Sequence, residues 1–281
     1  QNPDVRFASI NVDPHDANRL GAVGIVADAK RALAELAEAV EESRITSSDA
    51  WQQRVRTRNE QWQADRTHAL DADAPFDTSA LSDISDIVTD TNAVLTQGQL
   101  IGLLQEHAQP GDTIIAAAGG PPGDLQKVWD ATDRRYCHLE FGFSCMGYEI
   151  PAGLGVRLAV PDRNKRVVSF IGDGTFLMAP TELVTAAQEG LAVTVVVSEN
   201  HGYQVIHRLQ MGRSGREFGN EFRYRESGLD LTAESDSAKA PRLAGEYLRL
   251  DLVQIASGLG SRAVRAITPA EVRAALADTR D

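Results

Sequence analysis

The stretch VVSFIGDGTFLMAP occupies residues 167–180 and decides the fold of the sequence around it. An apolar run, typical of a buried strand, is followed at once by Asp173, which stands between Gly172 and Gly174. A carboxylate at the mouth of a buried strand needs a partner, because burying an unpaired charge is costly. No cationic residue adjoins Asp173, so a metal ion is one candidate partner, and a simple tight turn is the alternative.

From residue 90 onward, short apolar runs alternate with helical patterns, which predicts βαβ units and a parallel sheet covered on both faces. A capping box of Thr96 and Gln99 opens the first helix, for which Gly111 is the expected stop, and Gly190 is expected to close a later one. The expected strands are 113–120, 166–171, 192–200 and 262–267, and the other expected helices are 147–160, 180–190, 251–261 and 268–281. The predicted fold class is therefore α/β, with a doubly wound parallel sheet.

The residues before 90 predict a different organisation. A strand at 5–13 and a helix at 28–40, with Asp28 as its N-cap, are too little for a domain and indicate the tail of a preceding α/β domain. Residues 42–89 are highly charged and predict a helical linker, with Trp51, Val55 and Trp62 as a thin apolar stripe. We therefore expect boundaries at 1–41, 42–89 and 90–281. The last domain is expected to lack its final strand, because one more strand should follow the last helix.

Composition and charge limit the class of protein. The 281 residues carry a net charge of −12 and are 42% hydrophobic, which argues for a globular protein and against nucleic acid or an anionic membrane as the main partner. No apolar run approaches the ~20 residues of a membrane span. Only two cysteines occur, Cys137 and Cys145, so we expect two buried thiols in a reducing, cytoplasmic setting.

Polar residues follow two successive strands of the expected sheet. Asp173 ends one strand, and Asn200 ends the next, 27 residues and one βα unit later, with Gly202 two residues beyond it. In doubly wound sheets ligands bind beyond these strand ends, and neighbouring strands lie about 4.8 Å apart. A carboxylate, an amide oxygen and a backbone carbonyl there make an oxygen site suited to Mg²⁺ or Ca²⁺, with a phosphate as a further ligand.

The G-D-G followed by Asn resembles the diphosphate- and metal-binding motif of thiamine diphosphate enzymes. Longer stretches are similar to the trihydroxycyclohexanedione hydrolases of inositol breakdown, a resemblance that covers about 90–281. They are LTQGQLIGLLQEHAQPGDTIIAAAGGPPGDLQKVW (95–129), HLEFGFSCMGYEIPAGLGVRLAV (138–160) and ENHGYQVIHRLQMGRSGREFG (199–219).

The resemblance implies a thiamine diphosphate-binding fold and a role for individual residues. Asp173, the Asn200 side chain and the Gly202 carbonyl would hold Mg²⁺. Met146 would be the bulky residue under the cofactor that imposes its V shape, although plain core filling is the alternative. Backbone groups near Ser144 and Met146 would meet the aminopyrimidine. The diphosphate would contact Gly119, Gly120, Gly172, Gly174, Thr175 and Asn200.

The resemblance also implies an activity: hydrolytic ring opening of the cyclic 1,2-diketone 3D-(3,5/4)-trihydroxycyclohexane-1,2-dione to 5-deoxy-glucuronate. The activating glutamate of such enzymes lies on a pyrimidine-binding domain that these residues do not contain, so we expect that domain elsewhere in the parent chain, an active site between subunits, and a homodimer or tetramer. Residues 1–281 alone are expected to be inactive. A carboligase or decarboxylase resembling acetohydroxyacid synthase and a non-catalytic cofactor-binding subunit remain alternatives.

Other residues near the motifs leave their roles open. His201 and His207 flank the metal loop, and His201 is expected to be solvated there, with a contact to substrate or diphosphate as the alternative. Residues 211–228 predict either a lid over the ligand or a plain surface loop. His138 and Glu140 are candidates to face the substrate. Residues 203–210, YQVIHRLQ, depart from the smaller side chains expected in the hydrolases, which leaves the substrate less certain than the cofactor.

Overall fold

The computed structural model of the chain describes all residues except 1–3, 77–89, 93, 216–218, 226–244 and 280–281. Two compact units divide the chain, residues 1–63 and 64–281. The sequence-based boundaries at 41 and 89 remain predictions. Within the described residues, no helix is both long enough and apolar enough to cross a bilayer.

The first unit contains more than the expected strand and helix. Its two strands, β1 (Ala8–Asn11) and β2 (Val23–Val26), pair in parallel, and β2 was not predicted because the run VGIV is short. Between them lie α1 (Pro14–Ala17) and a 3₁₀ turn at Arg19–Gly21. The predicted helix is confirmed as α2 (Ala29–Glu42), capped by the Asp28 carboxylate. The linker helix is α3 (Asp49–Leu70).

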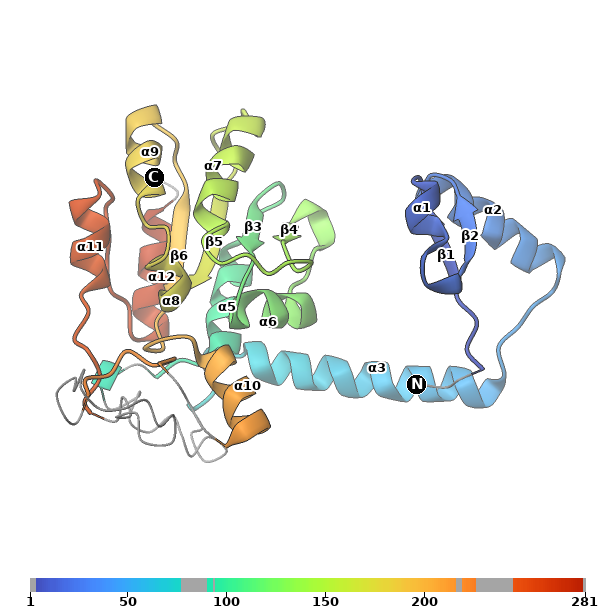
Figure 1. Cartoon of the computed structure of the whole chain (residues 1–281), viewed down its shortest axis with the longest axis horizontal. Coiled ribbons are helices and arrows are strands. Elements are labelled where there is room, and N and C mark those ends of the chain that lie inside the picture. Colours follow the sequence, from blue (N-terminus) through green and yellow to red (C-terminus); the bar gives the residue numbers. More distant parts are fainter. Residues whose placement is uncertain (1–3, 77–89, 93, 216–218, 226–244, 280–281) are drawn as a thin grey trace, which may run out of the picture. The chain divides into compact units, whose positions relative to one another are not determined.

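The second unit is built on four parallel strands in the order β4-β3-β5-β6, which run from right to left in Figure 1. This confirms the predicted doubly wound class. The bounds are β3 (Thr113–Ala116), β4 (Tyr136–Leu139), β5 (Val167–Gly172) and β6 (Thr194–Ser198). The chain leaves β3 for β4 on one side and then crosses to β5 on the other, so the winding direction reverses between β3 and β5.

Helices cover both faces of this sheet. Side chains of α5, α6 and α12 pack with Ile114, Val168 and Phe170 on one face, and Ile150, Phe176 and Leu183 pack with Ile171 on the other. The bounds are α5 (Gln97–His107), α6 (Gly120–Val128), α7 (Glu149–Ala159), α8 (Asp173–Phe176), α9 (Glu182–Glu189), α10 (Gln204–Ser214), α11 (Leu252–Gly258) and α12 (Pro269–Asp278), with a 3₁₀ turn at Thr132–Arg134.

The predicted ends of several elements are confirmed. Thr96 and Gln99 form the expected capping box, and Gly190 ends α9 with a left-handed φ of 62°. Gly111 is not the helix stop: α5 ends at His107, and Gly111 turns the chain into β3 with a φ of 93°.

In this unit one predicted strand is absent, and three elements of the structure were not predicted. Residues 262–267 form no strand, because they pair with none of the strands in the described part of the chain. Residues 204–214 form helix α10, and neither this helix nor β4 nor α6 was predicted. The cysteines also differ from expectation, because Cys137 is half-buried and Cys145 is exposed.

Candidate functional site

The reversal of strand order places the candidate residues at one edge of the sheet. Ligands of open α/β sheets bind beyond the carboxyl ends of the strands at such a switch point. Gly119 and Gly120 follow β3, Asp173 follows β5, and Asn200 follows β6. The structure therefore brings together the residues for which the sequence predicted a shared site.

The Asp173 carboxylate is the polar centre of this edge. The residue is only 2% exposed, and its oxygens accept backbone N–H bonds from Gly174 at 2.7 Å, from Asn200 at 3.0 Å and from Gly202 at 3.2 and 3.3 Å. Burial raises the pKa of Asp173 to about 6, although these donors act in the opposite direction. The donors thus hold the carboxylate without fully offsetting its desolvation.

Two further oxygens face the same carboxylate. The Asn200 amide oxygen lies 3.3 Å from Asp173 Oδ1 and 3.1 Å from the Gly202 carbonyl oxygen, with no donor between them. A 180° turn of the amide would replace these contacts with two hydrogen bonds. Ligand oxygens around Mg²⁺ at 2.0–2.1 Å are about 3 Å apart along an octahedral edge. The Asn200 side chain thus lies against both the Asp173 carboxylate and the Gly202 carbonyl, and in the orientation that directs its amide oxygen to them the three groups could supply oxygen ligands to a hard cation.

This set does not depend on a cluster of acidic or imidazole ligands. In the part of the chain that the structure describes, no group of three or more His, Cys, Asp or Glu side chains is placed to hold a metal ion. One carboxylate, one amide and one carbonyl are a weak set by themselves. Such a set suits Mg²⁺ that takes its remaining ligands from phosphate and water.

The glycines beside Asp173 serve different purposes. A Cβ at Gly174 would come within 2.7 Å of the Tyr203 ring, and the Gly174 N–H already donates to Asp173. Contact of Gly174 with the diphosphate stays a prediction, although its N–H donates to Asp173 in this structure. A Cβ at Gly172 would meet nothing within 4 Å, so the open side of the motif is there. Thr175 is buried in α8.

Gly119 and Gly120 form the opposite wall at the end of β3. Gly119 has a φ of 80°, which favours glycine, and a Cβ at Gly120 would approach Gln97 Nε2 within 2.8 Å. Prolines occupy the next two positions, and because proline carries no N–H, Gly119 and Gly120 are the amide donors at this corner.

Ser144 and Met146 lie in the loop between β4 and α7. Ser144 has a φ of 52°, and its hydroxyl donates to the Ala117 carbonyl at 3.3 Å. Glu140 fixes the loop by accepting the N–H groups of Phe143 at 3.1 Å and Cys145 at 2.9 Å. The Met146 side chain is 44% exposed, so core filling does not explain it. Its contact with a cofactor stays a prediction.

His138 lies at the same loop, with Nε2 2.9 Å from the Tyr148 hydroxyl. Contact of His138 or Glu140 with a substrate remains a prediction. The expectation of a solvated His201 is wrong: its side chain is buried, stacks on Tyr247 at 4.6 Å between ring centres, and lies 3.0 Å from Asp90 Oδ2. Burial lowers the pKa of His201, which favours the neutral imidazole.

Sequence reasoning missed the segment that holds the loop of Asn200 and Gly202. Tyr203 N–H donates to the Asn220 carbonyl at 2.7 Å, and Phe222 N–H donates to the His201 carbonyl at 2.9 Å. Glu221 in turn accepts from the Tyr247 hydroxyl at 3.0 Å and pairs with Arg223 at 2.9 Å. We call residues 220–223 the clasp. Of the predicted lid at 211–228, residues 211–214 belong to α10, while 216–218 and 226–228 lie outside the described residues.

Comparisons with known proteins identify the family of the chain. The family described as thiamine pyrophosphate enzyme, C-terminal TPP binding domain, matches residues 117–281. The chain is 32% identical over 290 residues to the 3D-(3,5/4)-trihydroxycyclohexane-1,2-dione hydrolase of Bacillus cereus (strain AH820). It is 31% identical over 287 residues to the protein of that name from Clostridium tetani (strain Massachusetts / E88). Each alignment covers 100% of this chain and 42% of the relative, so the chain spans less than half of their length.

A solved structure shares the fold. The thiamine diphosphate-dependent 4-hydroxybenzoylformate decarboxylase of Rhodococcus jostii RHA1 aligns with a TM-score of 0.50 and 20% sequence identity, over 64% of this chain and 29% of that one. This likeness supports the architecture alone. The family match runs from the end of β3 through α12 and includes both strand ends that carry the candidate site. The chain therefore belongs to the thiamine pyrophosphate enzymes and contains their C-terminal cofactor-binding domain.

Proposed function

We propose that this chain is the diphosphate-binding part of a thiamine diphosphate- and Mg²⁺-dependent hydrolase. Its substrate would be 3D-(3,5/4)-trihydroxycyclohexane-1,2-dione, opened to 5-deoxy-glucuronate in myo-inositol breakdown. The names of the relatives support the substrate, and the family match supports the cofactor. The observation that supports the metal is the proximity of the Asn200 side-chain amide to the Asp173 carboxylate and the Gly202 carbonyl.

In this proposal different residues of the chain bind the metal ion and the diphosphate. Asp173, Asn200 and Gly202 hold the cation, and the backbone donors around Asp173 keep its carboxylate aimed at it. The amides of Gly119 and Gly120 meet the diphosphate from the side of β3. The open space at Gly172 admits the phosphate next to the cation.

Thiamine diphosphate supplies, when bound, the nucleophilic carbon and the electron sink for cleaving the bond between two carbonyl carbons. The chain contributes position and electrostatics. The loop of Ser144 and Met146, fixed by Glu140, presents an apolar side chain toward solvent, which suits a face that is completed by another domain. We propose that this domain is a pyrimidine-binding domain that carries the activating glutamate, in a homodimer or tetramer.

Calorimetry of thiamine diphosphate with the complete gene product tests the metal role. Binding should require Mg²⁺, and Asn200→Ala should weaken it by at least about tenfold, or about 1.4 kcal/mol, because one ligand oxygen is lost. Asn200→Ala keeps the backbone N–H that donates to Asp173, so the loop should remain folded. Asn164→Ala, in the turn at the opposite edge of the sheet, is the matched control. Metal-independent binding, or equal affinities in both variants, would refute the proposed cation site.

Product analysis tests the substrate separately. The complete gene product, loaded with thiamine diphosphate and Mg²⁺, is incubated with the cyclic dione or with pyruvate. Release of 5-deoxy-glucuronate supports the hydrolase. Turnover of pyruvate alone would instead favour the carboligase or decarboxylase reading and leave the cation site standing.

A further inference from the structure

Glu149, the first residue of α7, has a buried carboxyl group to which the proposed function gives no role. The residue is 0% exposed. Its Oε1 accepts the N–H of Ala118 at 3.0 Å, whereas Oε2 has no hydrogen-bond partner among the residues that the structure describes. Glutamate is rarely buried without full pairing, so a buried carboxyl group with a single hydrogen bond calls for an explanation.

Glu149 lies where the strand order reverses, between β3 and β5. Ala118 is two residues past the end of β3. The Ser169 hydroxyl, in the middle of β5, donates to the Glu149 carbonyl at 2.7 Å. Gly153 allows α7 to approach β5 this closely, since a Cβ there would stand 2.6 Å from Ser169 Oγ. The side chain and the backbone of Glu149 therefore tie the start of α7 to both strands of the switch point.

The two segments that Glu149 joins carry the two walls of the predicted cofactor site. Residues 119–120 directly follow the residue that donates to Glu149, and the loop 144–148 leads into α7. The Ser144 hydroxyl makes a second and longer link between these segments, at 3.3 Å. The relative placement of the two walls thus depends on a small number of polar contacts, of which the Glu149 bond is the buried one.

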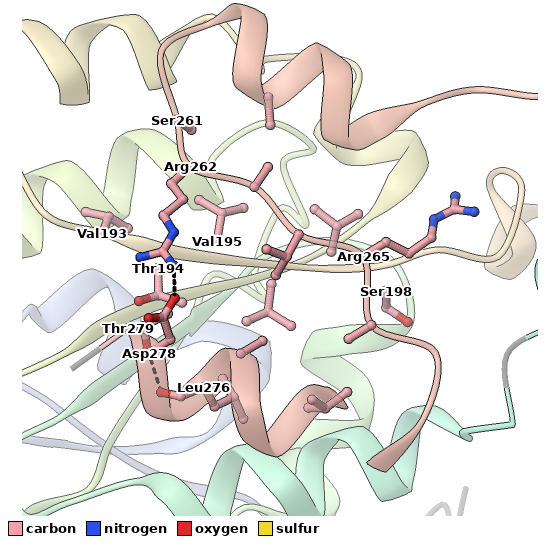
Figure 2. A pocket seen from close by; sticks show the side chains of 18 of the residues that line it. Val193, Thr194, Val195, Ser198, Ser261, Arg262, Arg265, Leu276, Asp278 and Thr279 are labelled. Carbon is pink, nitrogen blue, oxygen red and sulfur yellow. Dashed lines mark hydrogen bonds and ion pairs between the residues drawn. The ribbon is translucent and has the colours of Figure 1, made fainter. Parts of the chain in front are cut away.

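A cavity of about 560 Å³ beside β6 does not account for the Glu149 carboxyl. Val195, Ser198 and Arg265 line that cavity (Figure 2), and Glu149 does not. Burial raises the pKa of Glu149, and nearby backbone N–H groups lower it by less. The burial of this carboxyl is therefore explained by what its one hydrogen bond holds in place.

We infer that Glu149 is a positioning residue for the cofactor site, because its bond to Ala118 holds the turn 117–120 and the loop 144–148 at a fixed separation. Glu149 acts through these two segments and needs no contact with the cofactor. The inference rests on the proposed function, since a fixed separation matters only where both segments meet one ligand.

Two substitutions separate the hydrogen bond of Glu149 from its volume. Glu149→Met keeps the length of the side chain but removes Oε1, so the buried Ala118 N–H loses its partner. Glu149→Gln keeps an oxygen in that place, and its amide nitrogen would stand where Oε2 accepts no bond. Arg157→Met is the matched control. Arg157 is buried near the other end of α7, where it donates to the carbonyls of Lys165 at 2.6 Å and Asp162 at 2.8 Å.

Calorimetry of thiamine diphosphate with the complete gene product and Mg²⁺ tests the role in binding. Glu149→Met should raise the Kd by at least about tenfold, since one buried hydrogen bond is lost. Glu149→Gln and Arg157→Met should stay within about threefold of the wild-type Kd, although Arg157→Met should lower the Tm. An unchanged Kd for Glu149→Met, or equal losses of affinity in the two methionine variants, would overturn the inference. Binding by Glu149→Gln as weak as that by Glu149→Met would do the same.

Hydrogen exchange of the same proteins without cofactor keeps the inference separate from the proposed function. Glu149→Met should speed amide exchange by at least about tenfold in residues 118–120 and 144–148, whereas Arg157→Met should not. If the wild-type protein binds no thiamine diphosphate, the proposed function fails and exchange alone decides the inference. Exchange that Glu149→Met leaves at the wild-type rate in either segment would overturn it.

Discussion

Replacing Gly202 by alanine tests whether the clasp fixes the backbone of the metal loop. Gly202 has a φ of 138°, which L-residues rarely adopt, and an alanine Cβ would stand 2.2 Å from the Asn220 carbonyl oxygen and 2.9 Å from Glu221 Cα. Both atoms belong to the clasp backbone, so no side-chain rotation can relieve the contact. The loop and the clasp must separate.

The cost has two parts. A non-glycine residue in such a conformation costs about 1–3 kcal/mol. Separation of the clasp sacrifices the bonds from Tyr203 to Asn220 and from Phe222 to His201, each worth about 0.5–1.5 kcal/mol. Gly202→Ala should therefore lower the free energy of unfolding by about 2–6 kcal/mol, measured by urea denaturation, and should weaken Mg²⁺-dependent cofactor binding.

Gly190→Ala is the matched control. Gly190 has a φ of 62°, and its added Cβ would meet nothing within 4 Å, so only the left-handed backbone is penalised, by about 1–2 kcal/mol. If Gly202→Ala costs no more than Gly190→Ala, the clasp does not constrain the loop and the reasoning fails.

Three further predictions concern chemistry away from the metal loop. Burial raises the pKa of Cys137 to about 11, so only about one Cys137 thiol in 1,000 is ionised at pH 8. Iodoacetamide should therefore alkylate the exposed Cys145 before Cys137, as followed by mass spectrometry. Equal labelling rates for the two cysteines would contradict this. Arg166 donates to α12 at Leu276 and Thr279, so Arg166→Ala should cost about 2–4 kcal/mol in urea denaturation, and a loss below 1 kcal/mol would argue against that anchor. Burial raises the pKa of Glu221, but its hydrogen bonds outweigh this effect and leave the pKa below the usual range. The stabilisation that results is present above about pH 4.5 and is lost as the pH falls. Glu221→Gln should therefore reduce the dependence of the free energy of unfolding on pH in the acid range.

The meeting of Asp173 and Asn200 could be predicted because it follows from topology. Successive parallel strands end at one edge of a sheet, and a residue one βα unit later returns to that edge. Capping signals at Thr96 and Gly190 were equally local, since each depends on a few neighbouring atoms. Such features can be predicted because all the residues that form them lie close together in the sequence or follow from the order of the strands.

The parts that escaped prediction depend on distant partners. The clasp holds the metal loop through backbone hydrogen bonds, in which the Asn220 carbonyl accepts from Tyr203 and the Phe222 N–H donates to His201. Backbone bonds of this kind leave no side-chain pattern in the sequence. Helix α10 has no fully buried residue. Its sequence therefore does not show the buried apolar face from which an amphipathic helix is predicted. Residues 262–267 have a strand's composition, but a strand exists only when a neighbour pairs with it.

The pKa of Asp173 links the cation site to stability in a way that a pH series can test. Burial raises the pKa of Asp173 from its ordinary value of 3.8 to about 6 in the folded protein, so between these values the folded state binds more protons than the unfolded state. The free energy of unfolding should fall as pH rises from about 4 to 7, by up to about 3 kcal/mol from this carboxyl.

Asp173→Asn removes the titrating carboxyl. In metal-free protein it should therefore abolish this dependence of the free energy of unfolding on pH, whatever its effect on absolute stability. Saturating Mg²⁺ with thiamine diphosphate should reverse the slope in wild type, because a bound cation favours the ionised carboxylate. Parallel pH profiles for wild type and variant would show that the buried carboxylate is already satisfied by its backbone donors and has no need of a metal.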